Sequence, residues 1–114
     1  MGKPGIRKSP VACEPKPVII RNGKPASNEL IYVYAGEKLS FENQDRVDYR
    51  LRVVTEGQGR SDFDLFLGAE GTAAWIIDPR ARDDFSEYSV FNAFGEEKMT
   101  SGPTPIKIGP GPRP

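Results

Sequence analysis

The stretch YAGEKLSFENQDRVDYRLRV, residues 34–53, contains two short runs in which apolar and polar residues alternate, separated by a polar turn. In KLSFE (38–42) the second and fourth residues are apolar, and in YRLRVV (49–54) the first, third and fifth are. Alternation with a period of two is typical of a β-strand with one buried face. The stretch therefore predicts two strands joined by the turn NQDRVD, with Tyr49 directed inward.

The same pattern of short apolar segments between turn residues continues along the chain. Asn-Gly, Gly and Pro recur between these segments, and no segment has the spacing of an amphipathic helix. The sequence predicts an all-β, Greek-key β-sandwich of about seven to eight strands. The expected strands are residues 17–21, 30–34, 38–42, 49–54, 62–67, 73–77, 85–92 and 104–108.

Length and composition agree with one small β domain. The chain has 114 residues, of which 37% are hydrophobic, and it contains 12 glycines and 11 prolines. That many turn residues argue against a helical bundle. The formal net charge is zero, so no overall attraction to nucleic acid or to an anionic membrane is expected.

The termini differ from the expected domain at residues 17–109. Residues 1–16 are rich in proline and lysine, which predicts an extended arm, and residues 110–114 are expected to form a disordered tail. Residues 1–25 carry six basic side chains and one acidic, whereas residues 60–97 carry three arginines and nine carboxylates. The arm is thus either a basic tail on an acidic body or a segment that docks on that body or on an acidic partner.

The sequence also bears on redox compartment and location. Cys13 is the single cysteine, so no disulfide can form within the chain. No secretory signal and no apolar run long enough to span a bilayer is seen. We expect a cytoplasmic protein, unless a dedicated machine exports it.

Residues 33–53 resemble the cupredoxin family. The match consists of an apolar strand, a Gly-Glu step, an alternating strand, Asn43 and a polar turn. In that family a copper-binding histidine follows the turn, and Tyr49 stands at its position here. Residues 87–91 and 98–108 are similar to the strand that leads to the second ligand loop and to the closing strand. The resemblance implies a cupredoxin-like sandwich; an immunoglobulin-like sandwich is the alternative.

The resemblance does not extend to the copper ligands. A blue-copper site uses two imidazoles and a thiolate with a weak axial ligand, and this chain has no histidine. Cys13 lies in the arm rather than after residues 87–91, and Met99 alone cannot hold copper. The sequence therefore predicts a metal-free member of the fold, with no cofactor.

Other catalytic chemistries find little support. Without histidine, Ser-His-Asp and Cys-His sites are excluded, and no phosphate-binding loop is present. Paired carboxylates remain: Asp62 and Asp64 share a strand face, and Asp83 and Asp84 lie near Asp78. We interpret them as a solvated strand face and a polar loop, and predict that the protein is not an enzyme.

Several side chains are candidates for binding. Tyr32 and Tyr34 share one strand face and form either a contact surface or ordinary sandwich packing. Trp75 lies in AAWII, which favours the core over a ligand groove. Arg50 and Arg52 point outward, as does Lys38, and either face an acidic partner or form cross-strand ion pairs with Glu42. The candidate binding residues are Tyr49, Arg50, Arg52, Trp75, Tyr32 and Tyr34.

These observations predict a non-catalytic protein-binding or assembly module. Its partner would be a protein, including a second copy bound through the arm or a sheet edge, and neither nucleic acid nor membrane. MGKP at the start resembles the opening of spike-tip proteins of contractile secretion machines, which implies a bacterial or phage-like assembly. The alternative is a small-molecule or carbohydrate-binding domain that uses Trp75 or the tyrosines.

Overall fold

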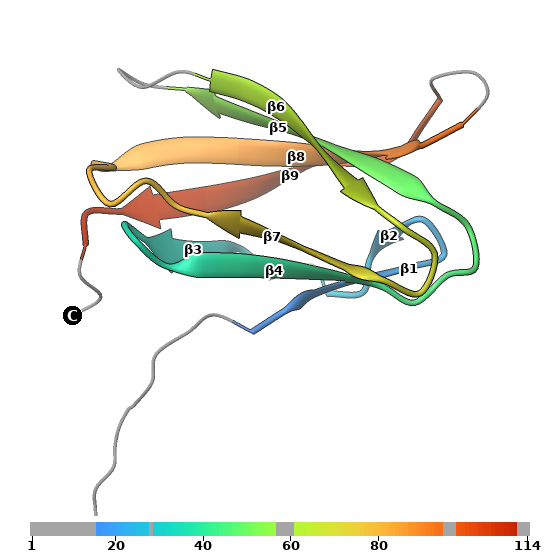
Figure 1. Ribbon diagram of the computed structural model, residues 1–114. Helices are drawn as coiled ribbons and strands as arrows, with labels where there is room; N and C mark the ends of the chain where they lie inside the picture. The colour runs from blue at the N-terminus through green and yellow to red at the C-terminus, as the bar shows by residue number, and fades with distance from the viewer. Residues whose placement is uncertain (1–15, 28, 57–60, 95–97, 112–114) are drawn as a thin grey trace, which may run out of the picture.

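The computed structural model describes residues 16–27, 29–56, 61–94 and 98–111. Cys13, nearly all of the predicted arm and most of the predicted tail lie outside these residues, so the predictions for them are untested. The described chain is all-β and forms two sheets that face each other (Figure 1). No helix that could cross a bilayer occurs in the described ranges.

The two sheets contain four and five strands. In the first sheet the spatial order is β2-β1-β4-β7, and in the second it is β3-β9-β8-β5-β6. The strands of the four-stranded sheet are β1 (Val18–Arg21), β2 (Lys24–Pro25), β4 (Lys38–Asn43) and β7 (Thr72–Ile76). The strands of the five-stranded sheet are β3 (Ile31–Tyr34), β5 (Tyr49–Glu56), β6 (Ser61–Leu67), β8 (Asp84–Asn92) and β9 (Met99–Gly109).

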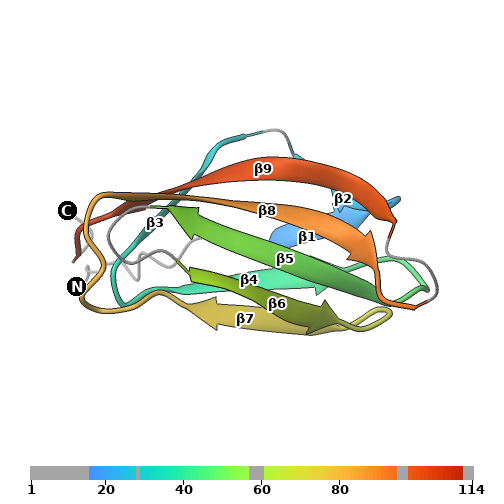
Figure 2. The same ribbon diagram turned by 90° about the horizontal axis from the view of Figure 1, so that it is seen from above.

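The connections cross between the sheets in a Greek-key arrangement. The β5–β6 hairpin is followed by β7 in the opposite sheet, and the chain then returns to β8 beside β5. A fourth strand lying next to the first defines this motif. Figure 2 shows β9, β8, β5 and β6 side by side in that order. The predicted all-β sandwich is confirmed.

The core lies between the two sheets and is made from the inward half of each alternating strand. Phe41 of β4 meets Tyr88 of β8 edge to face, with ring centroids 5.3 Å apart. Burial of this apolar layer is the main stabilising term of a sandwich. The buried hydrophobic residues are Ile20, Val33, Leu39, Phe41, Tyr49, Leu51, Val53, Leu67, Ile77, Tyr88, Val90, Ile106 and Ile108.

The two long sides of the sandwich are closed differently. On one side, β6 and β7 are the edges of their sheets, and Phe63 packs edge to face on Trp75 at 5.3 Å. On the other side, β1 and β3 border a cleft of about 400 Å³. The aromatic pair thus packs between the edge strands on one side, and the cleft lies on the other.

Two predicted boundaries were wrong near proline and glycine. β2 falls in a segment that we expected to be a loop, and β9 begins at Met99 rather than at residue 104. β9 continues through its glycine because Gly102 has φ +124° and a Cβ there would lie 2.7 Å from Ser89 Cα. Only glycine allows this approach. Gly102, which in the sequence indicates a loop, therefore allows β9 to continue.

Candidate functional site

The turn between β4 and β5 is held in place by Asn43, whose side chain is buried. Its Nδ2 donates to the carbonyl oxygens of Val47 at 2.8 Å, Gly68 at 3.1 Å and Leu67 at 3.2 Å. Its Oδ1 accepts from the Asp45 amide at 2.8 Å. One amide side chain therefore connects the turn to the end of β6 and is fully hydrogen-bonded.

Tyr49 points inward from the start of β5, as predicted, and its hydroxyl donates to Asp45 Oδ2 at 2.6 Å. The same carboxylate accepts from the amides of Asn22 at 3.0 Å and Gly23 at 2.9 Å. Burial raises the pKa of Asp45, but these three hydrogen bonds and the charge of Arg21 outweigh it and lower the pKa overall. Burial, together with Asp45, raises the pKa of Tyr49 to about 12.

These residues do not fit a type 1 copper centre. The position that the resemblance assigns to a copper-binding histidine carries Tyr49, a protonated phenol that donates to Asp45. The full chain has no histidine to supply an imidazole, and within the described ranges no three Cys, Asp or Glu residues come together as a metal site. The Tyr49–Asp45 pair connects the β1–β2 and β4–β5 turns by hydrogen bonds.

Next to Tyr49, one row of outward side chains crosses the five-stranded sheet. In register, Phe66 of β6 lies beside Arg50 of β5, then Phe91 of β8 and Met99 of β9. The Arg50 guanidinium carbon lies 4.6 Å from the centre of the Phe91 ring, and Phe66 packs edge to face on Phe94 at 6.4 Å. We refer to these five residues as the aromatic corner.

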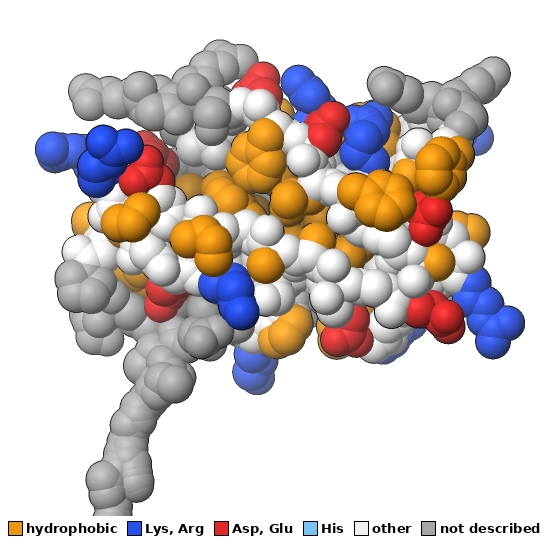
Figure 3. Space-filling view, viewed as in Figure 1, with side chains coloured by type: hydrophobic (Ala, Val, Ile, Leu, Met, Phe, Trp, Pro, Cys, Tyr) orange, Lys and Arg blue, Asp and Glu red, His pale blue; other side chains and the backbone are white. Residues whose placement is uncertain are grey.

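Three of the five residues of the aromatic corner are exposed to solvent. The exposed fraction is 58% for Phe66, 71% for Phe94 and 50% for Met99. Figure 3 shows hydrophobic side chains gathered over the end of β6, next to basic side chains. Single exposed apolar residues are common, but two exposed rings in contact, as Phe66 and Phe94 are, are typical of a contact site.

Arg50 and Arg52 form ion pairs across the β5–β6 hairpin. Asp64 lies 3.2 Å from each arginine, and Asp62 lies 3.7 Å from Arg52. The expectation of pairing with Glu42 was wrong, because β4 belongs to the other sheet. The four charges cancel, so this part of the sheet has no excess of either sign.

The six predicted binding residues do not form one site. Arg50 lies at the aromatic corner and Tyr49, its neighbour in β5, is buried on the inner face, whereas Tyr32 is exposed at the opposite end of the sheet, on β3. The ring of Tyr34 lies against Gly109, where a Cβ would come within 2.6 Å of it. Trp75 is half-buried against Phe63, which agrees with its predicted place at the core.

Sequence reasoning missed the aromatic residues of the corner. Phe66 could have been found, because strict alternation in SDFDLFL places it on the outward face with Asp62 and Asp64. Phe94 lies in a segment that the sequence predicts only as a loop. No sequence signal indicates that it folds back onto Phe66.

Comparison with known proteins bears on the fold alone. No protein-family model matches the sequence, and no curated protein matches it either. Two solved structures match over 87% of this chain and 86% of theirs, each with a TM-score of 0.55 and 16% identity. One is a reduced tryptophan-to-tyrosine mutant of amicyanin, and the other is the reduced Cu(I) form, at pH 4, of a proline-to-glycine mutant of amicyanin. The fold is cupredoxin-like. The cupredoxin-like expectation is therefore preferred over the immunoglobulin-like alternative.

Proposed function

We propose that this chain is a non-catalytic protein-binding or assembly module on a metal-free cupredoxin-like sandwich, and that the aromatic corner is its contact surface. The observation that carries the proposal is the contact between two exposed rings, Phe66 and Phe94. Met99, which lies beside Phe91 in the same row, is also exposed. A monomer gains nothing from leaving three large apolar side chains in water at one corner. A partner that covers them removes that apolar surface from water.

The make-up of the corner supports a protein partner. Aromatic residues, methionine and arginine are the types enriched in the cores of protein interfaces. The Arg50 side chain is already held between the Phe91 ring and Asp64, and it is only 19% exposed. Side chains fixed in this way lose less conformational entropy when a partner binds.

The first partner to test is a second copy of the chain. Arg50 and Arg52 are matched by Asp62 and Asp64 on the same face, so two copies can approach without like-charge repulsion. Assembly through the edge of β6 is the weaker route, because acidic side chains on an edge strand oppose strand addition. The arm at residues 1–16 is the other predicted route.

Light scattering on a sizing column tests the proposal. We expect the full chain to form a defined oligomer that dissociates on dilution, and the double variant Phe66→Ser, Phe94→Ser to be monomeric. Ile76→Ser is the matched control, because Ile76 is 59% exposed on the other sheet. A full chain that stays monomeric at every concentration contradicts self-assembly.

A shortened chain, residues 17–114, separates the corner from the arm. It keeps every strand, since β1 begins at Val18. If the corner holds the oligomer, the shortened chain associates like the full chain. If it is monomeric while the full chain is not, the arm is the assembly element. The bacterial or phage-like setting stays a prediction.

The alternative of a sugar or small-molecule site on Trp75 receives less support. The indole and the Phe63 ring pack edge to face with centroids 5.3 Å apart, and the Trp75 side chain packs against the core. A stacking platform for a sugar needs an aromatic face open to solvent.

A further inference from the structure

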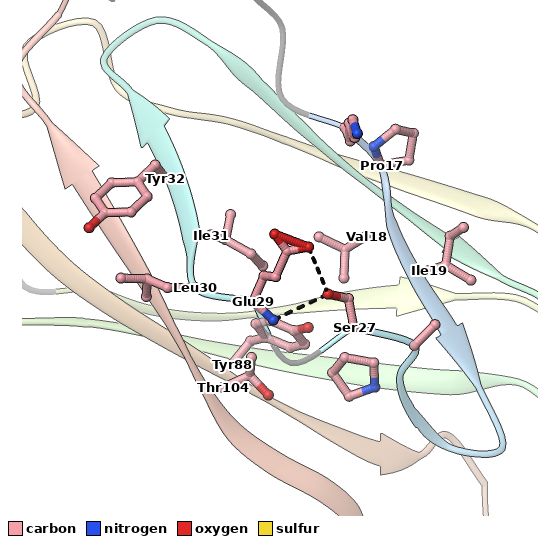
Figure 4. Close-up of a pocket in the computed structure, with 13 residues that line it drawn as sticks. Pro17, Val18, Ile19, Ser27, Glu29, Leu30, Ile31, Tyr32, Tyr88 and Thr104 are labelled. Carbon is pink, nitrogen blue, oxygen red and sulfur yellow. Dashed lines mark hydrogen bonds between the residues drawn. The ribbon is translucent and has the colours of Figure 1, made fainter.

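A separate cleft opens on the long side of the sandwich away from Trp75. It has a volume of about 400 Å³ and lies between the start of β1 and the edge strand β3. Its walls are largely apolar and include Pro17, Val18, Pro25, Leu30 and Ile31. Figure 4 shows Val18 and Ile31 on the two strands, with the Glu29 carboxylate drawn between them and the Tyr88 ring below.

The volume suits a small organic molecule. Ligand-binding pockets for compounds of that class measure about 300–1,000 Å³ and are mostly apolar with a few polar groups. Val18 and Ile31 also pack on the core from their two strands. The cleft is therefore framed by both sheets and does not depend on a loop alone.

The polar group at the base of the cleft is the hydroxyl of Tyr88. The residue is 1% exposed, and no hydrogen-bond partner for its hydroxyl exists within the described chain. Burial raises the pKa of Tyr88 to about 12, and the nearby Thr104 hydroxyl opposes this rise. Thr104 lowers the pKa as a nearby hydrogen-bonding group, but no hydrogen bond of acceptable distance and angle joins the two side chains.

The fold has no structural use for this hydroxyl. The Tyr88 ring packs edge to face on Phe41, and a phenylalanine would make the same contact. A buried hydroxyl without a partner destabilises the protein unless something else pairs with it. Tyr88 is one of the residues that line the cleft, so a molecule that enters the cleft and reaches the hydroxyl can supply the missing acceptor.

The charges at the cleft narrow the class of ligand. Lys16 and Glu29 both border it, and their opposite signs favour neither an anion nor a cation. The phenol is protonated at neutral pH and acts as a donor, and burying a charged ligand against apolar walls is unfavourable. We propose that the cleft binds a neutral, largely apolar small molecule whose carbonyl oxygen accepts a hydrogen bond from Tyr88. This site is distinct from the aromatic corner and does not depend on the proposed function.

Two probes of matched shape test the hydrogen bond. Benzophenone carries a ketone oxygen, and diphenylmethane has the same two rings without it. Amide chemical shifts of the full chain would be followed by NMR during titration with each. We expect benzophenone to shift the amides of Val18, Leu30, Ile31 and Thr104 and to bind more tightly than diphenylmethane.

The variant Tyr88→Phe separates the hydroxyl from the shape of the cleft. It should weaken benzophenone binding by about three- to tenfold, the usual range for one neutral hydrogen bond, and leave diphenylmethane unchanged. Leu30→Arg, at a position that is 42% exposed, should block both probes without disturbing the core. Ile76→Arg, at a position that is 59% exposed on the edge strand β7 and outside the cleft, is the control and should alter neither.

Three results would overturn the proposal. One is benzophenone shifts that map outside the cleft. Another is an equal effect of Tyr88→Phe on both probes. The third is cleft amides that shift on dilution of the protein alone, since this would mean that a second copy of the chain occupies the cleft.

Discussion

The hydroxyl of Tyr49 donates a 2.6 Å hydrogen bond to Asp45 Oδ2, at the place where the resemblance to cupredoxins would put a copper ligand. Tyr49→Phe removes that bond but keeps the ring in the core. Because the acceptor is a carboxylate, we expect a loss of about 1–2 kcal/mol in the free energy of unfolding. Urea denaturation followed by circular dichroism measures it.

Tyr88→Phe is the matched control for that measurement. The Tyr88 hydroxyl is buried without a hydrogen-bond partner in the described chain. Its removal should leave the free energy of unfolding unchanged or raise it slightly. Equal losses in the two variants would mean that the Tyr49–Asp45 bond contributes nothing specific.

Stability should also depend on pH through Asp45. Its pKa is lower in the folded protein than in the unfolded chain. The stability that ionised Asp45 contributes is therefore fully present above about pH 4–5. It is lost as the pH falls through the lower pKa that Asp45 has in the folded protein. Tyr49→Phe removes one cause of the lowering, so its stability should fall less steeply on acidification.

Asp78 has to be separated from this effect. A hydrogen bond from the Arg80 amide lowers the pKa of Asp78; burial opposes this, and the Arg80 side chain adds to the lowering. Asp78 therefore also makes the protein less stable as the pH falls, but Tyr49→Phe leaves the contribution of Asp78 unchanged. Unfolding midpoints between about pH 2 and 6 that keep a constant offset between wild type and Tyr49→Phe would refute the role of Asp45.

Among the polar residues around the β4–β5 turn, we expect substitution of Asn43 to lower the free energy of unfolding most. Asn43→Ala leaves the carbonyl oxygens of Val47, Leu67 and Gly68 without their shared donor. We expect a loss of about 2–3 kcal/mol, since buried polar groups without partners are costly. Gln44→Ala is the control, because its contacts with Arg21 are exposed, and it should cost less than about 1 kcal/mol.

The alternation of apolar and polar residues predicted which side chains of each strand face inward, but not which strands lie next to each other. The inward position of Tyr49 and the outward positions of Arg50 and Arg52 follow from a period of two. The partners of the arginines depend on strand order, and that order placed Asp64 rather than Glu42 beside them. The cleft at Tyr88 likewise requires knowledge of which edges face each other. No local pattern contains that information.

The Phe63–Trp75 contact predicts a fluorescence response. Phe63→Ala removes the ring that covers one side of the indole, so Trp75 emission should shift to longer wavelength. The loss of a partly buried ring should cost about 2–3 kcal/mol. Phe66→Ala, which removes an exposed ring on the opposite face of the same strand, should change neither. Unchanged emission in Phe63→Ala would contradict the observed packing.

The pair Arg50–Asp64 offers a test of how rigid the aromatic corner is. Its atoms are 3.2 Å apart, with side-chain exposures of 19% and 40%, and the Phe91 ring holds the guanidinium from the other side. A double-mutant cycle with Arg50→Ala and Asp64→Ala should give a coupling of about 0.5–1 kcal/mol, reduced in about 1 M salt. Arg46 and Glu70 are 3.9 Å apart and far more exposed, so the same cycle there should give almost no coupling. Equal couplings in the two cycles would mean that Arg50 is as mobile as an ordinary surface arginine, and the corner would then lose its advantage as a pre-ordered contact surface.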